Sequence, residues 1–386
     1  QDALAAYQTK LLEYRRYLHA HPELSFQEVE TQKYIIEHMS KLKHAEIIQP
    51  VGTSVLVKFV TGKVGPKVGL RADIDALPIL EERHELEFKS KHDGVMHACG
   101  HDIHTSMLMT ACHYFDEHFD NLTGEVWAIF QHAEELLPGG AQEMVATGLF
   151  NDLDFIYGQH IWSNLPIGTI DVKDGPASSN TDAYIIKIQG KGGHASQPEN
   201  SIDPVIIGAM IVQKLQTIVS RMISPQEAGV ISNTYFNSGR KEAINVIPDV
   251  CYLGGSVRSS SEAMRHLFKD TITKMVNSTC EEYGATCEID YTLGYGVTYN
   301  NPEKTAFVRA IANEVEGATV IADKCMLGGE DFSAFASIVP STFVFVGGGN
   351  PKLDFDYPHH HPKFGIDEDG MMHGLQLLIN VVEQYP

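Results

Sequence analysis

Residues 97 to 104 read HACGHDIH, which places three histidines, a cysteine and an aspartate around one glycine. A cysteine beside a histidine could form a nucleophilic pair, because the imidazole can take the thiol proton. The same groups could bind a divalent cation, since thiolate and imidazole are ligands of Zn²⁺ and related ions. A third interpretation is a polar loop in which Cys99 is only a small buried hydrophobic residue. This segment alone leaves the three open.

Acidic and histidine side chains also end several apolar segments elsewhere in the chain. They are Asp73 and Asp75 in LRADID, Glu134 and Glu135 in VWAIFQHAEE, and His160 in FIYGQHIW. In open α/β sheets the carboxyl ends of the strands form the functional crevice, so we expect these residues to meet there. A cysteine nucleophile has no use for adjacent glutamates, whereas a metal site does. The pattern therefore favours a metal site.

The neighbouring residues Glu134 and Glu135 are expected to have different roles. Adjacent side chains in an extended segment point to opposite sides, so Glu134 and Glu135 could serve different tasks. One could bind a metal while the other holds the attacking water as general base. A solvated strand end is the alternative, but the preceding run VWAIFQ is apolar and indicates a buried strand.

The helices and strands that must position these residues are predicted to alternate in two different orders. A chain of 386 residues exceeds the usual size of one core, so two domains are expected. Apolar segments alternate with helical ones over residues 1–180 and 295–386, which predicts a large α/β domain with a sheet covered on both faces. Residues 181–294 show the order β-α-β-β-α-β, which predicts an inserted ferredoxin-like α+β domain.

Three local predictions accompany this fold. Apolar residues at spacings of three and four predict an N-terminal helix that stops at His21-Pro22. Ser25 and Glu28 have the spacing of a capping box that would open a second helix. Residues 244–259 are predicted to form one continuous strand.

The composition restricts the partners and the compartment. The formal net charge of −21 repels phosphate backbones and anionic lipids, so neither nucleic acid nor a membrane is an expected partner. The first residues lack the basic-then-apolar order of a secretory signal, although a leader removed before residue 1 stays open. Six cysteines without paired spacing predict free thiols and a cytoplasmic location.

Eight motifs together carry a family resemblance. They are LRADIDALPI, HACGHDIHTSML, AEE, GQHIW, GKGGHASQP, INVIPD, GEDFS and HHHPKFGID, in this order. The chain resembles the M20 metallopeptidase and aminoacylase family over nearly its whole length. It looks most like the amidohydrolase branch of that family, subfamily D, which contains N-acyl-amino-acid, hippurate and indoleacetyl-amino-acid hydrolases. The resemblance implies a metal-binding catalytic domain and an inserted lid or dimerisation domain.

The resemblance also implies a site with two divalent cations per subunit. The matching metal ligands are Cys99, His101, Glu135, His160 and His360, with His359 or His361 as alternatives to the last. Glu134 matches the general base, and Asp75 matches the acid that orients a ligating imidazole. Other branches have a histidine where this chain has Asp73, so His101 is expected to replace that ligand. Manganese is the expected metal, with zinc, cobalt and nickel as alternatives.

The inserted domain contributes further implied site residues. His194 in GGHAS matches the histidine that reaches the reacting carbonyl, often across a dimer interface. Asn245 and Arg258 match substrate-contacting positions, and a guanidinium can bind a substrate carboxylate through two hydrogen bonds. A homodimer or higher homo-oligomer is therefore expected.

The implied reaction is hydrolysis of the amide bond in an N-acyl amino acid by a metal-activated water, with Glu134 as general base. A metallo-exopeptidase or dipeptidase using the same residues is the first alternative. A metal-dependent binding protein without catalysis is the second. A cysteine hydrolase with Cys99 as nucleophile is the third, and its activity would survive chelators.

Overall fold

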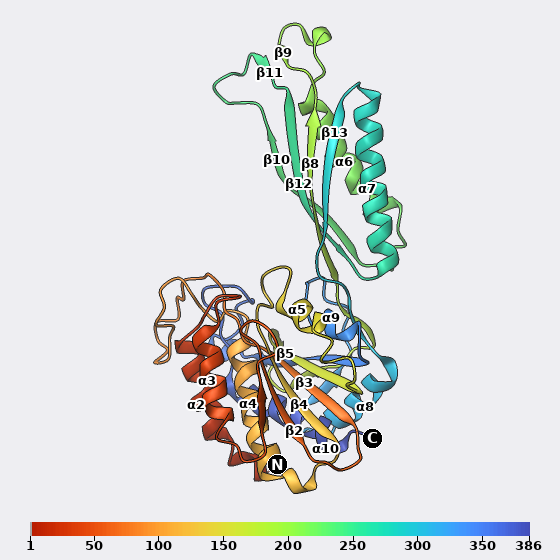
Figure 1. The fold of residues 1–386 in the computed structure, drawn as a ribbon. Coiled ribbons are helices and arrows are strands. Elements are labelled where there is room, and N and C mark those ends of the chain that lie inside the picture. Colours follow the sequence, from red (N-terminus) through yellow and green to blue (C-terminus); the bar gives the residue numbers. More distant parts are fainter. Residues whose placement is uncertain (1) are drawn as a thin grey trace. The chain divides into compact units, whose positions relative to one another are not determined.

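The structure is a computed structural model that describes residues 2–386, and the chain divides into two compact units (Figure 1). Unit 1 comprises Gln1–Ala177, Thr298–Lys324 and Asp331–Pro386, and unit 2 comprises Ser178–Val297 and Cys325–Glu330. Each unit has its own hydrophobic core. The roles of the two units as catalytic domain and lid stay predictions.

Unit 1 is built on a mixed sheet of eight strands within the described residues. Their spatial order is β1 (Glu46–Ile48), β2 (Val55–Val60), β4 (Glu125–Gln131), β3 (Lys67–Asp73), β5 (Phe155–Pro166), β16 (Ser341–Gly349), β6 (Thr169–Asp171) and β15 (Thr319–Ile321). The central strands β4, β3, β5 and β16 run parallel, so their carboxyl ends share one edge. The predicted α/β class is confirmed.

Helices of unit 1 pack on this sheet and on one another. They are α1 (Asp2–Ala5), α2 (Gln8–Ala20), α3 (Val29–Met39), α4 (His101–Glu117), α5 (Gly140–Ala146), α8 (Pro302–Ala312), α9 (Ser333–Ala336) and α10 (Met371–Gln384). In Figure 1, α2 and α4 lie side by side, and α4 also contacts β3 and α10. No helix within residues 2–386 is long and apolar enough to cross a membrane.

Strand β5 shows how the central strands are covered on both faces. Gln159 donates to the carbonyl of Gly374 on α10, so this residue points toward the α4 and α10 layer. Its neighbour Gly158 faces the other way, where a Cβ would lie 2.7 Å from the ring of Phe332. Because alternate residues point to opposite faces, this strand is buried on both sides.

Unit 2 has a four-stranded antiparallel sheet in the order β10-β12-β8-β13, counted over its described residues. Its elements are β8 (Asn180–Gln189), α6 (Pro204–Arg221), β10 (Gly229–Ser238), β12 (Val250–Ser259), α7 (Glu262–Glu282) and β13 (Thr286–Leu293). Helix α6 starts at a capping Asp203 followed by Pro204, and α7 starts at a capping Ser261. The predicted ferredoxin-like order is confirmed.

Short strand pairs complete the fold. Strand β9 (Gly193–His194) pairs with β11 (Val246–Ile247), and β7 (Gly175–Ser178) pairs with β14 (Thr298–Asn300). The predicted continuous strand over residues 244–259 is wrong, because β11 ends before Pro248 and β12 begins at Val250. Proline has no N–H to donate to a neighbouring strand, so the ladder is interrupted there.

The predicted capping box is also wrong. Helix α3 begins at Val29 without a side-chain cap. Ser25 Oγ instead donates to Asp75 Oδ2 at 2.6 Å, and the Glu28 carboxylate accepts from the backbone N–H of Ala133 at 2.6 Å. Both side chains thus form hydrogen bonds with residues that follow β3 and β4, and not with the start of their own helix.

Helix α4 carries a histidine whose titration predicts part of the pH dependence of stability. Burial and the nearby Lys10 lower the pKa of His113 to about 4, and its Nε2 lies 2.7 Å from Tyr14 Oη. The unfolded chain therefore takes up this proton first, so stability should fall as the pH drops from about 6.5 toward 4. We expect His113→Gln to reduce that loss, measured as urea midpoints at pH 7.5 and pH 5. Equal midpoint changes in both proteins would contradict the assignment.

Candidate metal centre

Cys99 and His101 lie where a loop meets the start of α4. Gly100 between them has φ +84°, in the left-handed region that favours glycine. A Cβ at Gly100 would lie 2.4 Å from Cγ2 of Ile161 on β5. Glycine is therefore needed for the two ligand-type residues to lie against the middle of β5.

His101 has one ring nitrogen fixed and the other directed into a group of acids. Its Nδ1 lies 2.8 Å from the Asp75 carbonyl oxygen and 3.0 Å from Asp75 Oδ1, both acceptors. Nδ1 must therefore carry the proton that it donates. The opposite nitrogen, Nε2, lies 3.2 Å from Asp73 Oδ2, 3.5 Å from Glu135 Oε1 and 3.7 Å from Glu134 Oε2.

Two of these inward-facing atoms are buried without a hydrogen bond. Within the described chain, neither His101 Nε2 nor Asp73 Oδ2 has a hydrogen-bond partner. A buried polar atom left unpaired costs about 1–3 kcal/mol. A cation between the two atoms would remove that cost, so their arrangement fits a metal.

The two glutamates do not point to opposite sides, contrary to the sequence-based expectation. Strand β4 ends at Gln131, and Ala133 has φ +49°, which turns the chain before Glu134. Both carboxylates then come within 4 Å of His101 Nε2. The extended geometry on which the expectation rested has already ended at this point.

Side chains from separate segments form overlapping groups that could each hold an ion. Cys99 Sγ lies 3.6 Å from His160 Nε2, and Glu135 Oε1 lies 3.2 Å from His360 Nε2. Among the described residues of unit 1, the groups of three are Cys99–His101–His160, Asp73–His101–His104, Cys99–Glu135–His360 and His101–Glu134–Glu135. His101 belongs to three of them, and Cys99 and Glu135 belong to two each, as expected for ligands arranged around neighbouring ions.

Of the three consecutive histidines, His360 is the one that faces this cluster. His359 stacks on Trp162 with ring centroids 4.3 Å apart, and its Nε2 accepts from the Ser163 N–H. His361 accepts the Lys363 N–H on its Nδ1. His360 has φ +71°, and this left-handed conformation separates its direction from those of its neighbours.

The electrostatics of the protein alone are unfavourable for a thiolate. Burial, Glu135 and Glu134 raise the pKa of the Cys99 thiol well above its ordinary value. Burial opposes the charge on Asp73, but the charges of His101 and Arg71 lower the pKa of Asp73 well below its ordinary range. A bound divalent cation would lower the pKa of the Cys99 thiol, because its positive charge stabilises the thiolate and the carboxylates together.

Comparison with known proteins places the chain in a family. Residues 69–384 match the model of peptidase family M20/M25/M40. The chain belongs to this family. The family predicted from the sequence is thus confirmed, and with it the class of hydrolases that act on amide bonds.

Relatives in the M20 family carry related activities. Thermostable carboxypeptidase 1 of Saccharolobus solfataricus is 42% identical over 363 residues, covering 93% of this chain and 91% of its own. The N-acyl-L-amino acid amidohydrolase of Geobacillus stearothermophilus is 43% identical over 295 residues, which cover 76% of this chain and 79% of that protein. A Bacillus subtilis crystal structure, described as a dinuclear metal binding peptidase from the M20 family, matches with a TM-score of 0.84 and 32% sequence identity. The match covers 98% of this chain and 99% of the other chain.

Unit 2 of this M20 protein carries the other predicted site residues. His194 and Asn245 are neighbours, because Val246 pairs with His194 and the Asn245 carbonyl accepts from Ala195. Arg258 lies near the other end of β12, about 26 Å from its first residue at roughly 3.3 Å per residue. The structure brings His194 and Asn245 together and leaves Arg258 apart from them.

Sequence reasoning missed a buried ionic network behind the M20 site. The Arg71 guanidinium donates to Gln131 Oε1 at 2.7 Å and to Asp331 Oδ1 at 2.8 Å, and it lies 3.5 Å from Asp73 Oδ2. Asp331 Oδ2 accepts from Gln131 and from the N–H of Ala141. The apolar context of RAD and the motif GEDFS were the only sequence signals for this network.

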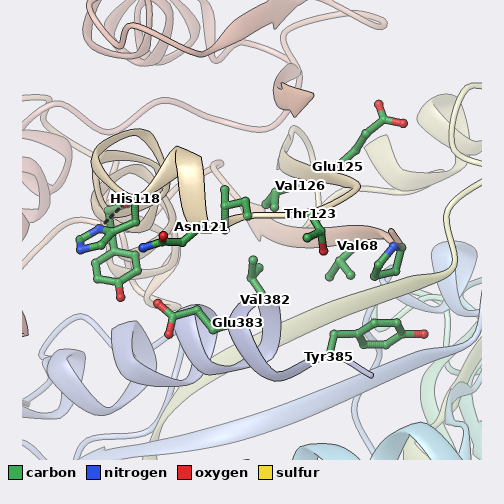
Figure 2. A pocket seen from close by; sticks show the side chains of 12 residues that line it. Val68, His118, Asn121, Thr123, Glu125, Val126, Val382, Glu383 and Tyr385 are labelled. Carbon is green, nitrogen blue, oxygen red and sulfur yellow. Dashed lines mark hydrogen bonds between the residues drawn. The ribbon is translucent and has the colours of Figure 1, made fainter. Parts of the chain in front are cut away.

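A separate cavity lies at the opposite edge of the unit 1 sheet. It has a volume of about 260 Å³ and lies where β3 and β4 begin, beside the last residues of α10 (Figure 2). Val68, Val126 and Val382 contribute apolar surface, and Glu383 lies nearby. None of the predicted site residues lines this cavity, so it is not the predicted site.

Proposed function

We propose that the protein is a metal-dependent amidohydrolase that cleaves the amide bond of N-acyl amino acids. The observation that carries this proposal is the buried cluster around His101 Nε2, where an imidazole, a thiol and three carboxylates converge. Similarity to an N-acyl-L-amino acid amidohydrolase and to an N-acetylcysteine deacetylase of Bacillus subtilis, 37% identical over 95% of this chain, supports the substrate class.

Two divalent cations per subunit would be held by five residues of unit 1. These are Cys99, His101, Glu135, His160 and His360. When bound, such cations supply Lewis acidity that lowers the pKa of water toward neutrality and polarises a carbonyl. Manganese is the proposed metal, and the similarity to a dinuclear metal binding peptidase supports the number of ions.

The chain supplies the acid–base chemistry. Glu134, which is nearly buried, takes the proton of the attacking water on its carboxylate and passes it to the leaving nitrogen. Asp75 holds His101 by accepting from its Nδ1, while Ser25 and the Glu135 N–H donate to the other Asp75 oxygen. These bonds fix the imidazole before any substrate arrives.

The residues of unit 2 have proposed roles on the substrate. His194 would stabilise the oxyanion that forms at the reacting carbonyl, and Arg258 would bind the substrate carboxylate. Asn245 is held beside His194 and would act with it. We also propose a homodimer or higher oligomer and a cytoplasmic location.

An exopeptidase is the second candidate, favoured by the 42% identity to a thermostable carboxypeptidase. The same residues could attack a peptide bond, because it is also an amide. The acyl side of the substrate decides between the two activities. A matched panel of N-acetyl amino acids, hippurate and dipeptides separates them by kcat/KM.

Removal and return of the metal tests the reaction class. We expect activity on the panel to vanish after complete chelation and to return with Mn²⁺ more fully than with Zn²⁺, Co²⁺ or Ni²⁺. Metal content is measured on the same samples. Activity that persists in metal-free protein would exclude the proposal and favour Cys99 as a nucleophile.

Alkylation of Cys99 provides a second, independent prediction. A metal-bound thiolate is shielded, so we expect bound Mn²⁺ to slow its labelling by iodoacetamide, as read by peptide mass spectrometry. Cys287 is half-buried in unit 2 and serves as an internal control whose labelling should not respond to metal. Labelling of Cys99 that is measurable in metal-free protein and unchanged by bound Mn²⁺ would remove it from the ligand set.

A further inference from the structure

His104 uses both ring nitrogens to join two strands of the unit 1 sheet. Its Nδ1 lies 2.6 Å from Asp73 Oδ1 at the end of β3, and its Nε2 lies 2.8 Å from the backbone nitrogen of Ile161 in β5. The N–H of Ile161 can only donate, so Nε2 must be the acceptor and Nδ1 must carry the proton. His104 is therefore a neutral bridge with no lone pair left for a metal.

This bridge stands where the two strands cease to pair. Strands β3 and β5 are joined in parallel register from Val68↔Phe155 to Arg71↔Gly158, and the ladder goes no further. Strand β3 stays paired with β4 as far as Asp73. The imidazole thus connects β3 to β5 beyond the last backbone pairing.

The candidate metal ligands come from both sides of this junction. His160 belongs to β5 and directly precedes Ile161, the residue that donates to His104. His101 lies on α4 beside Asp73, one turn before His104. The side chain of Ile161 also lies against Gly100, so α4 contacts β5 through backbone and side chain at one residue.

We propose that His104 is a positioning residue that sets the spacing between the two parts of the metal centre. It rests on the proposed function, because it presumes that His101 and His160 bind metal. A rigid ring that accepts from one strand and donates to the other fixes the distance from His160 to the ligands around Asp73. Its neutral tautomer is imposed by the Ile161 N–H rather than by the metal.

Three variants test the proposal on purified full-length protein reconstituted with Mn²⁺. His104→Leu removes both hydrogen bonds, His104→Gln keeps one donor and one acceptor, and His104→Asn keeps them on a side chain one methylene shorter. Of the two Mn²⁺ ions, we expect the more weakly bound one to bind the Leu variant about 10- to 100-fold less tightly than wild type. This is the usual effect of losing a residue that orients the metal ligands. The Gln variant should recover most of that affinity and the Asn variant less.

The readouts are titration of Mn²⁺ binding and the electron paramagnetic resonance spectrum of the Mn²⁺ pair, in which spin coupling reports the separation of the ions. His118→Leu, at the end of the same helix, is the control and should leave both unchanged. Wild-type affinity and coupling in a folded Leu variant would overturn the inference. If that variant does not fold, equal affinities of the Gln and Asn variants would overturn it. Wild-type protein that binds no metal would instead refute the proposed function, and the inference with it.

Discussion

Replacing Glu134 with glutamine is expected to lower kcat by about 100- to 10,000-fold, the usual contribution of a general base. The metals should stay bound, because Glu135 and not Glu134 belongs to the proposed ligand set. The Michaelis constant should change little, since the amide keeps the size of the side chain. Steady-state kinetics on N-acetyl amino acids, with metal content measured on the same samples, gives both quantities.

The geometry around Glu134 explains this expectation. The turn at Ala133 brings its Oε2 to 3.7 Å from His101 Nε2, within the same group as Glu135. Its side chain is nearly buried, so water does not screen it from the reacting atoms. A carboxylate so placed can accept a proton from water bound in the cluster, whereas an amide cannot.

A matched control comes from helix α5, which follows the turn that contains Glu134. Glu143 pairs with His132 at 3.0 Å and has a partly exposed side chain, so Glu143→Gln should keep wild-type activity. Retained turnover in the Glu134→Gln variant would exclude Glu134 as the base. Loss of turnover together with loss of metal would instead make Glu134 a ligand.

Replacing Asp331 with alanine is expected to lower the free energy of unfolding by about 3–5 kcal/mol, the range for breaking one side of a buried ion pair. Arg71 and Asp331 are 2% and 1% exposed, so the loss removes a carboxylate that balances the Arg71 charge in the interior and leaves Asp73, 3.5 Å away, as a more distant counter-charge. The bonds from Gln131 and the Ala141 N–H are lost as well. Chemical denaturation monitored by tryptophan fluorescence measures the change, since Trp127 and Trp162 both lie in unit 1.

The control for this effect is a solvent-exposed pair in the same unit. Asp174 lies 3.1 Å from Arg309, and both side chains contact solvent. Exposed pairs contribute about 0–1 kcal/mol, so Asp174→Ala should be nearly neutral. Equal effects of the two substitutions would show that the Arg71 network does not hold unit 1 together.

Elements with an uninterrupted period were predictable from the sequence, and the long-range contacts were not. The order of strands and helices in unit 2 could be predicted because α6, α7 and β8 each keep one spacing of apolar residues over their length. Strand β16 could be located as an apolar run between turns. Such patterns are local, so they require no knowledge of what each element contacts.

Within the site, residue types could be predicted but directions could not. The acids at the ends of β3 and β4 follow from position in the chain, whereas the turn at Ala133 depends on a backbone angle that no residue type dictates. The pairing of Arg71 with Asp331 joins residues 260 positions apart, and no regular spacing in the sequence indicates it. Ser25 and Glu28 matched a helix cap locally, but tertiary hydrogen bonds replaced it.

The chain order of the two units has a consequence for biosynthesis. Strand β16 pairs with β5, yet Ser341 is made 185 residues after its partner Ile156, and all of unit 2 lies between them in the sequence. Unit 2 has nearly continuous sequence and can fold on the ribosome while the larger sheet still lacks a central strand. Contacts this distant in sequence form slowly, so unit 1 should be the later and more aggregation-prone part to mature. His360 follows β16, which makes completion of the metal centre one of the last events of folding.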